Sequence, residues 1–124
     1  MLKDDFFTIK EITDEDNVRT YRLALNASHI IFQAHFAGSP TMPGACIVQT
    51  IKELASDCFG KSFFISTVKN TKFLNVINPL VHPEVSVQMT STSQDNGDVS
   101  ISAVIKDSDT IFSKAILILK CTKE

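Results

Sequence analysis

Apolar and polar residues alternate along several short stretches of this chain, which is the pattern of β-strands that bury one face. The alternation is clearest at 18–25, 85–90 and 99–105, and strands are also predicted at 6–12, 62–73 and 110–120. An Asn96-Gly97 pair favours a tight hairpin between the two stretches that flank it. The last stretch is apolar on both faces for most of its length, so we expect it to be an inner strand of the sheet.

One segment, 43–59, follows a helical pattern instead and predicts the only long helix. Pro43 suits a first helical turn, because the N–H that proline lacks has no acceptor there, and Gly60 suits the C-terminal cap. One broad side of this helix is apolar, and the other side carries Gln49, Lys52, Glu53 and Ser56. About six strands and one helix predict an α+β fold, with a single curled antiparallel sheet wrapped around a central helix. No linker or repeat interrupts 1–124, which predicts a single domain.

Composition removes several classes of function. The chain has 124 residues, a formal net charge of −2 and ordinary apolar and charged fractions of 44% and 21%, so no basic face for nucleic acid is expected. No apolar run approaches the roughly 18 residues of a membrane span, and the N-terminal residues lack the apolar core of a signal peptide. Three cysteines without CxxC spacing argue against disulfides and a zinc site, so we expect a cytoplasmic protein without a bound metal.

The residues with chemical potential precede the predicted helix, where 35–44 reads H-F-A-G-S-P-T-M-P-G. This run places His35 on a loop and Gly44 in the first helical turn, whose backbone N–H groups lack helical acceptors and carry partial positive charge. Glycine lets a substrate approach the backbone closely, so its N–H can polarise a carbonyl oxygen and stabilise an enolate-like charge. A nearby imidazole can then remove a proton from the adjacent carbon. This arrangement suits chemistry at the carbon α to a thioester.

The same run resembles the signature of the bacterial 3-hydroxyacyl-acyl-carrier-protein dehydratases of fatty acid synthesis, H-F-P-G-x-P-x-M-P-G. It matches at seven of the ten positions, with Ala37 in place of the first proline. The resemblance implies a hot-dog fold and a homodimer, or a higher assembly of dimers, with active sites at the subunit interface. It also implies an acyl substrate held by the phosphopantetheine of an acyl-carrier protein, and no cofactor.

Site residues follow from the resemblance position by position. His35 matches the catalytic histidine and Gly44 the backbone donor to the thioester carbonyl, with Phe36 and Ala45 in the substrate-binding site. The family's second catalytic group is a carboxylate fourteen residues after the histidine, where this chain has Gln49, and four residues later, where glutamine is common, it has Glu53. The two residue types are exchanged on one helix face. The P-H-R-Y-P-F-type segment of the housekeeping enzymes is also absent, which indicates a divergent branch.

The exchange leaves three mechanisms open, because a glutamine amide orients a hydroxyl but does not transfer protons near neutral pH. Glu53 supplies the proton, or His35 makes both transfers, or the protein is no efficient dehydratase. We expect a lyase that converts (3R)-hydroxyacyl thioesters to trans-2-enoyl thioesters. The alternatives are a hot-dog thioesterase and a non-catalytic acyl-binding subunit, since one fold hosts several chemistries.

Overall fold

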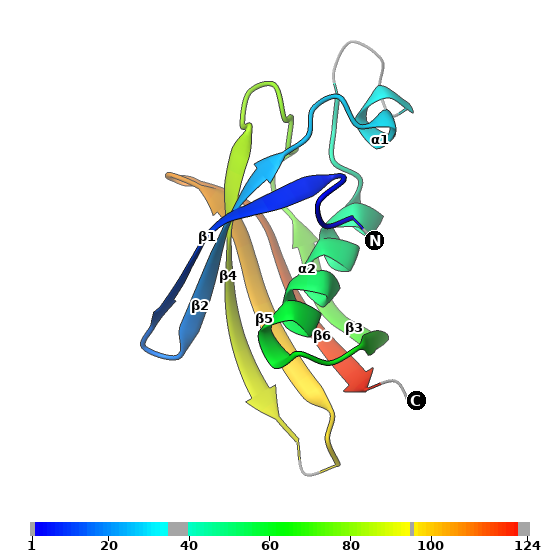
Figure 1. The fold of residues 1–124 in the computed structure, drawn as a ribbon, viewed down its shortest axis with the longest axis vertical. Helices are drawn as coiled ribbons and strands as arrows, with labels where there is room; N and C mark the ends of the chain where they lie inside the picture. Colours follow the sequence, from blue (N-terminus) through cyan, green and yellow to red (C-terminus); the bar gives the residue numbers. More distant parts are fainter. Residues whose placement is uncertain (1, 35–39, 95, 122–124) are drawn as a thin grey trace.

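The computed structural model describes residues 2–34, 40–94 and 96–121. Six strands form one antiparallel sheet in the order β1-β2-β4-β5-β6-β3. Their bounds are β1 Phe7–Glu15, β2 Val18–Leu25, β3 Phe63–Phe73, β4 Glu84–Ser93, β5 Val99–Asp107 and β6 Thr110–Cys121. The sheet curls around one long helix, α2 (Gly44–Phe59), which lies on its concave face (Figure 1). This arrangement confirms the predicted α+β hot-dog fold.

The strands bury the residues that the alternating pattern selects. On β2, Tyr21, Leu23 and Leu25 are buried, and the residues between them are only partly so. Strand β6 lies between β5 and β3, which confirms the predicted inner strand. Strand β3 is at the edge of the sheet, and its register with β6 shifts twice, between Ile65 and Thr67 and between Val68 and Asn70.

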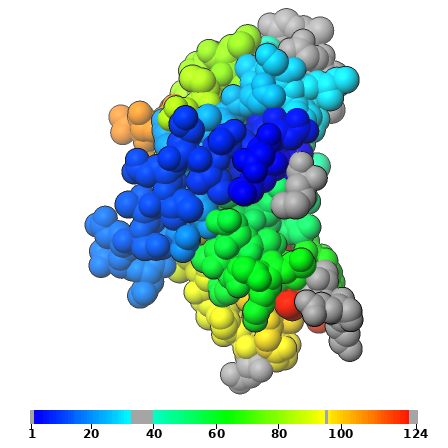
Figure 2. Space-filling model, in the orientation of Figure 1, coloured from blue at the N-terminus to red at the C-terminus, as the bar shows by residue number. Residues whose placement is uncertain are grey.

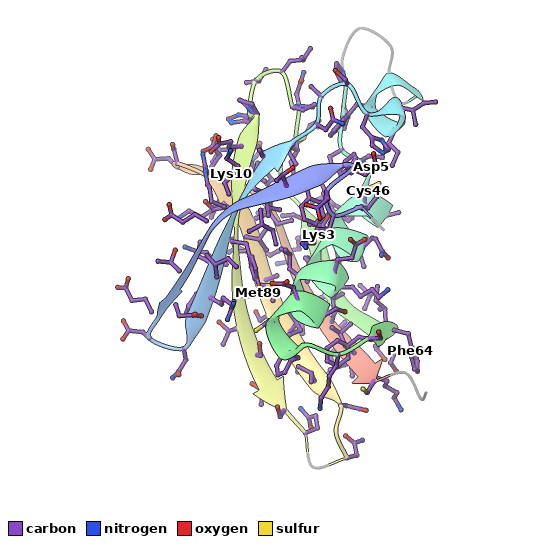
Figure 3. All side chains as sticks on the ribbon, viewed as in Figure 1. Lys3, Asp5, Lys10, Cys46, Phe64 and Met89 are labelled. Atoms are coloured by element: carbon purple, nitrogen blue, oxygen red, sulfur yellow. The ribbon has the colours of Figure 1, made fainter. Side chains whose placement is uncertain are left out.

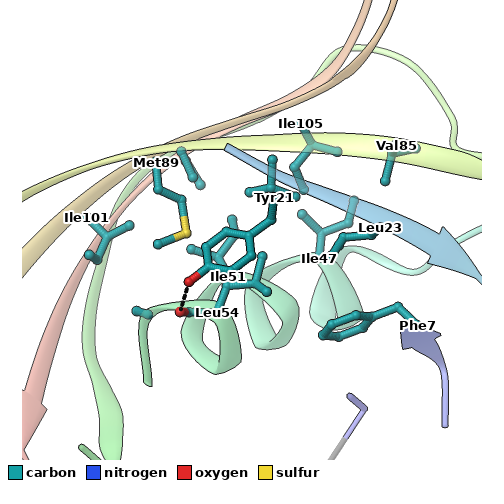
Figure 4. Close-up of a cluster of buried hydrophobic side chains, with 14 of the residues drawn as sticks. Phe7, Tyr21, Leu23, Ile47, Ile51, Leu54, Val85, Met89, Ile101 and Ile105 are labelled. Carbon is teal, nitrogen blue, oxygen red and sulfur yellow. Dashed lines mark hydrogen bonds between the residues drawn. The ribbon is translucent and has the colours of Figure 1, made fainter. Parts of the chain in front are cut away.

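Helix α2 fills the concave face with its apolar side. It begins at Gly44, one residue after the predicted start, and ends at Phe59. Gly60 is the C-terminal cap, and its positive φ of 64° is the left-handed conformation that glycine adopts readily. Figure 4 shows Ile47, Ile51 and Leu54 directed toward the sheet, where the hydroxyl of Tyr21 donates to the Leu54 carbonyl over 3.3 Å. The helix is therefore part of the hydrophobic core.

A second, short helix, α1 (Ile30–Ala34), lies in the segment that the sequence pattern leaves irregular. The preceding turn is held by local side-chain bonds, from the Ser28 N–H to Asn26 Oδ1 and from the Ile31 N–H to His29 Nδ1. Five residues are too few to show a helical period, so pattern analysis misses this element. In the described residues, no helix is both long and apolar enough to cross a membrane.

Candidate active site

The first turn of α2 carries backbone donors without acceptors. Pro43 occupies the N-cap position in an extended conformation and gives no side-chain cap, while its carbonyl accepts from the N–H groups of Cys46 and Ile47. The N–H groups of Gly44 and Ala45 therefore have no acceptor within the described ranges. Such donors, at the positive end of the helix dipole, can bind a carbonyl oxygen or an anion.

A pocket of about 300 Å³ opens beside this turn. It is lined by Thr41, Met42, Gly44, Ile47 and the segment 73–77 that follows β3. Apolar side chains dominate the lining, which suits an acyl chain better than a charged ligand. The Met42 N–H donates to the Ile77 carbonyl over 2.9 Å, so the end of the sequence motif is fixed against one wall of the pocket.

Phe73 lies directly over Gly44. A Cβ atom placed on Gly44 would lie 2.9 Å from Phe73 Cζ, closer than real contacts allow. Phe73 is 57% exposed and lies at the surface over the glycine. Glycine at this position therefore lets the ring and the helix backbone approach each other closely.

Gln49 does not line this pocket. It follows Gly44 by five residues, which places it about 140° around the helix. Its side-chain Nε2 donates to Glu53 Oε2 over 2.8 Å, so the exchanged pair does share one helix face as expected. Within a single chain, the structure does not bring Gly44 and Gln49 to one pocket.

Glu53 is buried, with only 2% of its surface exposed, although the helical pattern places it on the polar side. The difference arises because the N-terminal residues fold over it: the Leu2 N–H donates to Oε2 and the Lys3 N–H to Oε1, each over 2.9 Å. Burial raises the pKa of this carboxyl, but the hydrogen bonds from Leu2, Gln49 and Lys3 outweigh burial and leave the pKa below its ordinary value. Glu53 is therefore ionised at neutral pH.

The remaining predicted site residues are distributed as follows. His35 and Phe36 lie outside the described residues. Ala45 is exposed next to Gly44, at the open end of the helix. Cys46, one residue further, is half-buried, and burial raises the pKa of its thiol, which keeps it protonated and a poor nucleophile. The described part of the chain holds no group of three or more His, Cys, Asp or Glu side chains suited to a metal ion.

The sequence pattern does not predict the roles of Phe73 or of the backbone N–H groups of Leu2 and Lys3 at the site. Phe73 reads only as an apolar residue at a strand end, and nothing in its neighbourhood of sequence points to Gly44, which lies 29 positions away. The donors of Leu2 and Lys3 are backbone atoms, which no residue type identifies. Glu53 itself is the one residue that points to these donors. It lies between buried residues on α2, and a buried carboxylate needs hydrogen-bond donors.

The fold and the motif together define a class, the hot-dog dehydratases. The family model of the ApeI-like proteins, described as ApeI dehydratase, matches residues 11–114. The chain belongs to this family. It is 31% identical over 100 residues to a 3-hydroxyacyl-[acyl-carrier-protein] dehydratase FabZ of Lactiplantibacillus plantarum, an alignment that covers 75% of this chain and 67% of that protein. A FabZ of Caulobacter vibrioides is 36% identical over 67 residues, which covers 45% of the chain and 42% of the relative.

Solved structures agree on the fold. The dehydratase heterocomplex ApeI:P of Xenorhabdus doucetiae has a TM-score of 0.66 at 15% identity, covering 93% of this chain and 97% of that one. A mutant thioesterase of Pseudomonas aeruginosa scores 0.65 at 11% identity, covering 94% and 81%. Both chemistries therefore occur on this fold, and the likeness alone does not choose between them. The alignments to the curated relatives span about two thirds of those relatives' own length.

Proposed function

We propose that the protein removes water from 3-hydroxyacyl thioesters carried by an acyl-carrier protein and forms trans-2-enoyl thioesters. The observation that carries this proposal is the uncapped first turn of α2, whose Gly44 N–H stands at an apolar pocket directly after the His35 motif. Membership of the ApeI-like dehydratase family supports it, as do the FabZ relatives, whose printed activity is this dehydration. The unit that acts is the single domain 1–124.

In the proposed reaction, the thioester carbonyl oxygen accepts a hydrogen bond from the Gly44 N–H. The partial positive charge of the helix terminus stabilises the negative charge that develops on this oxygen, which acidifies the α-carbon. His35 removes the α-proton, the C3–O bond breaks, and the electron pair of the C–H bond becomes the new C2–C3 double bond. The proton on His35 passes to the hydroxyl as the C3–O bond breaks, so that the hydroxyl departs as water.

This scheme uses His35 for both proton transfers, one of the three mechanisms that the exchanged residues leave open. A general acid near neutral pH needs a raised pKa. Glu53 has a lowered pKa instead. It accepts all three of its hydrogen bonds, which stabilise the ionised carboxylate over the protonated acid. We therefore assign the role of proton donor to His35 and the role of orienting the hydroxyl to Gln49.

We further propose a homodimer in which each active site combines His35 and Gly44 of one copy with Gln49 of the second. The position of Gln49, about 140° from Gly44 on the helix, supports a site shared between copies. Strand β3 supplies a free edge, and exposed apolar side chains gather on it and just beyond it, at Phe64, Val68, Phe73, Leu74 and Val76. Part of α2 also reaches the surface in Figure 2. Burial of these groups would stabilise a dimer.

An acyl-carrier protein is the proposed partner, because the substrate class requires one. Lys72 directly precedes Phe73 at the pocket and lies opposite Lys114 on the neighbouring strand. Both lysines are exposed, and no ion pair joins either of them to another described residue. Uncompensated positive charge at this place fits an acidic partner. All three cysteines are free, which agrees with the reducing cytoplasm as the proposed location.

The test is the reverse reaction. Purified protein is incubated with a crotonyl thioester, and both 3-hydroxybutyryl thioester and free thiol are measured. A dehydratase forms the hydroxyacyl thioester and releases no thiol. Free thiol as the main product would instead identify a thioesterase, and no product of either kind would favour an acyl-binding subunit. Either result would overturn the proposal.

A further inference from the structure

Among the described residues, three neutral donors hold the carboxylate of Glu53. Oε1 accepts from the Lys3 N–H, and Oε2 accepts from both the Leu2 N–H and Gln49 Nε2. No lysine, arginine or histidine among the described residues forms an ion pair with it. A charge that is 2% exposed and forms no ion pair with a described residue depends strongly on the hydrogen bonds that it receives.

This arrangement fixes the orientation of the Gln49 amide. An ionised carboxylate only accepts hydrogen bonds, so the edge of the amide that faces Glu53 must be its NH2 group. The carbonyl oxygen, on the other branch of the planar amide, then points away from Glu53 and remains an acceptor for a ligand. With a neutral residue at 53 that can also donate, both orientations of the amide would be possible.

The N-terminal segment that supplies these backbone donors also contacts α1 and the turn before it. The side chain of Asp5 lies 3.2 Å from His29 Nε2, and its carbonyl accepts from Asn26 Nδ2 over 2.9 Å. Phe6 stacks on Phe32 of α1 with ring centres 4.6 Å apart. Figure 3 shows Lys3 and Asp5 beside the same half of α2 as Cys46. One short segment, residues 2–6, therefore contacts Glu53 and also the helix that leads into the His35 motif.

We propose that Glu53 is a positioning residue which, held by the main chain of residues 2 and 3, orders the Gln49 amide so that its oxygen accepts the hydrogen of the substrate's 3-hydroxyl. This inference rests on the proposed dehydration. A hydroxyl that donates its hydrogen to Gln49 keeps a lone pair free, and that lone pair takes the proton from His35 as the C3–O bond breaks. Gln49 thus acts by geometry alone, and no proton passes through Glu53.

A double-mutant cycle tests the coupling, with Gln49→Ala, Glu53→Gln and the double variant compared in crotonyl thioester hydration. The enoyl substrate carries no hydroxyl, so we expect an unchanged KM and a kcat lowered on the order of tenfold to a hundredfold in each single variant. Glu53→Gln should add almost nothing in the Gln49→Ala background. Glu11→Gln, at an exposed carboxylate on β1, is the matched control and should leave kcat unchanged. Multiplying effects in the double variant would overturn the proposal, because Glu53 would then act independently of Gln49.

A second measurement does not depend on activity. The side-chain NH2 signals of Gln49 in nitrogen-15 NMR spectra should show slow hydrogen exchange in the wild type and fast exchange in Glu53→Gln. Lys3→Pro, which removes one N–H donor to Glu53, should speed the exchange, whereas Lys3→Ala, which keeps that N–H, should not. Equal exchange in all four proteins would overturn the positioning role. A wild type that lacks hydration activity but shows the expected exchange would overturn the proposed reaction and leave the ordering of Gln49 by Glu53 confirmed.

Discussion

Two neighbouring turns of α2 are opposites in hydrogen bonding. In the open turn, the N–H groups of Gly44 and Ala45 lie beside a pocket and have no acceptor among the described residues. In the closed turn, Gln49 to Glu53, the Glu53 carboxylate accepts three hydrogen bonds. A helix terminus without partners is stable only where water or a ligand satisfies it, so the open turn is suited to binding. Glu53 is only 2% exposed, so its carboxylate is not accessible to a substrate. The closed turn is therefore suited to holding neighbouring groups in place.

The largest effect should come from the residue that the proposal places next to the open turn. His35→Ala should lower kcat for thioester hydration by about 10² to 10⁴, since both proton transfers lose their carrier. Thermal unfolding should stay near the wild-type temperature. His82→Ala is the control, because His82 hydrogen-bonds Asp107 over 2.8 Å, outside the pocket lining. Activity of His35→Ala within a few-fold of wild type would show that His35 does not carry the protons of the reaction.

Closing the open turn should have the next largest effect. Gly44→Ala places a Cβ atom 2.9 Å from Phe73 Cζ and narrows the approach to the backbone N–H, so kcat/KM should fall by on the order of tenfold to a hundredfold. Adding Phe73→Leu should relieve the steric conflict and restore thermal stability, but not activity. Recovery of both quantities would show that the loss came from the steric conflict with Phe73 and not from a blocked approach to the N–H of residue 44.

The closed turn should control stability at acidic pH. The pKa of Glu53 is lowered when the protein folds, so its contribution is complete above its ordinary value of 4.5 and is lost as pH falls through the lowered value. Wild-type unfolding free energy should therefore decline below about pH 4.5, and Glu53→Gln should remove part of that decline. At neutral pH the variant should lose about 1–3 kcal/mol, because one backbone donor loses its acceptor. An unchanged acid limb in urea unfolding would contradict the ionised, bonded state.

A smaller effect is expected at Tyr21, which packs against α2 beyond both turns. Its hydroxyl lies 3.3 Å from the Leu54 carbonyl and 3.2 Å from Asp57 Oδ2, and burial raises the pKa of the phenol, so the group remains a neutral donor. Tyr21→Phe should cost about 1 kcal/mol of unfolding free energy and leave kcat unchanged. A large loss of activity would extend the functional part of α2 beyond the first two turns.

The sequence predicts those features that repeat with a short period. The alternation at 18–25 correctly predicts β2, and Pro43 and Gly60 correctly mark the ends of α2. Both signals depend only on residues that are close in the sequence. The helical period puts Glu53 on the polar side of α2. It cannot predict the burial of this residue, because the segment that covers Glu53 is 50 positions away in the sequence. Phe73 against Gly44 is missed for the same reason. The catalytic roles of His35 and Gln49 remain predictions from the motif.

The central claim is that one active site takes its open turn from one copy of the chain and Gln49 from another, and complementation tests it most directly. His35→Ala and Gln49→Ala are co-expressed with different tags, and the mixed dimer is purified through both tags. It should contain one intact site and regain up to about half of wild-type kcat per dimer. The mixed dimer of His35→Ala with Gly44→Ala should be no more active than the Gly44→Ala parent, because both changes lie in the same half of the site. If the first mixed dimer is no more active than its two parents, the shared site is contradicted.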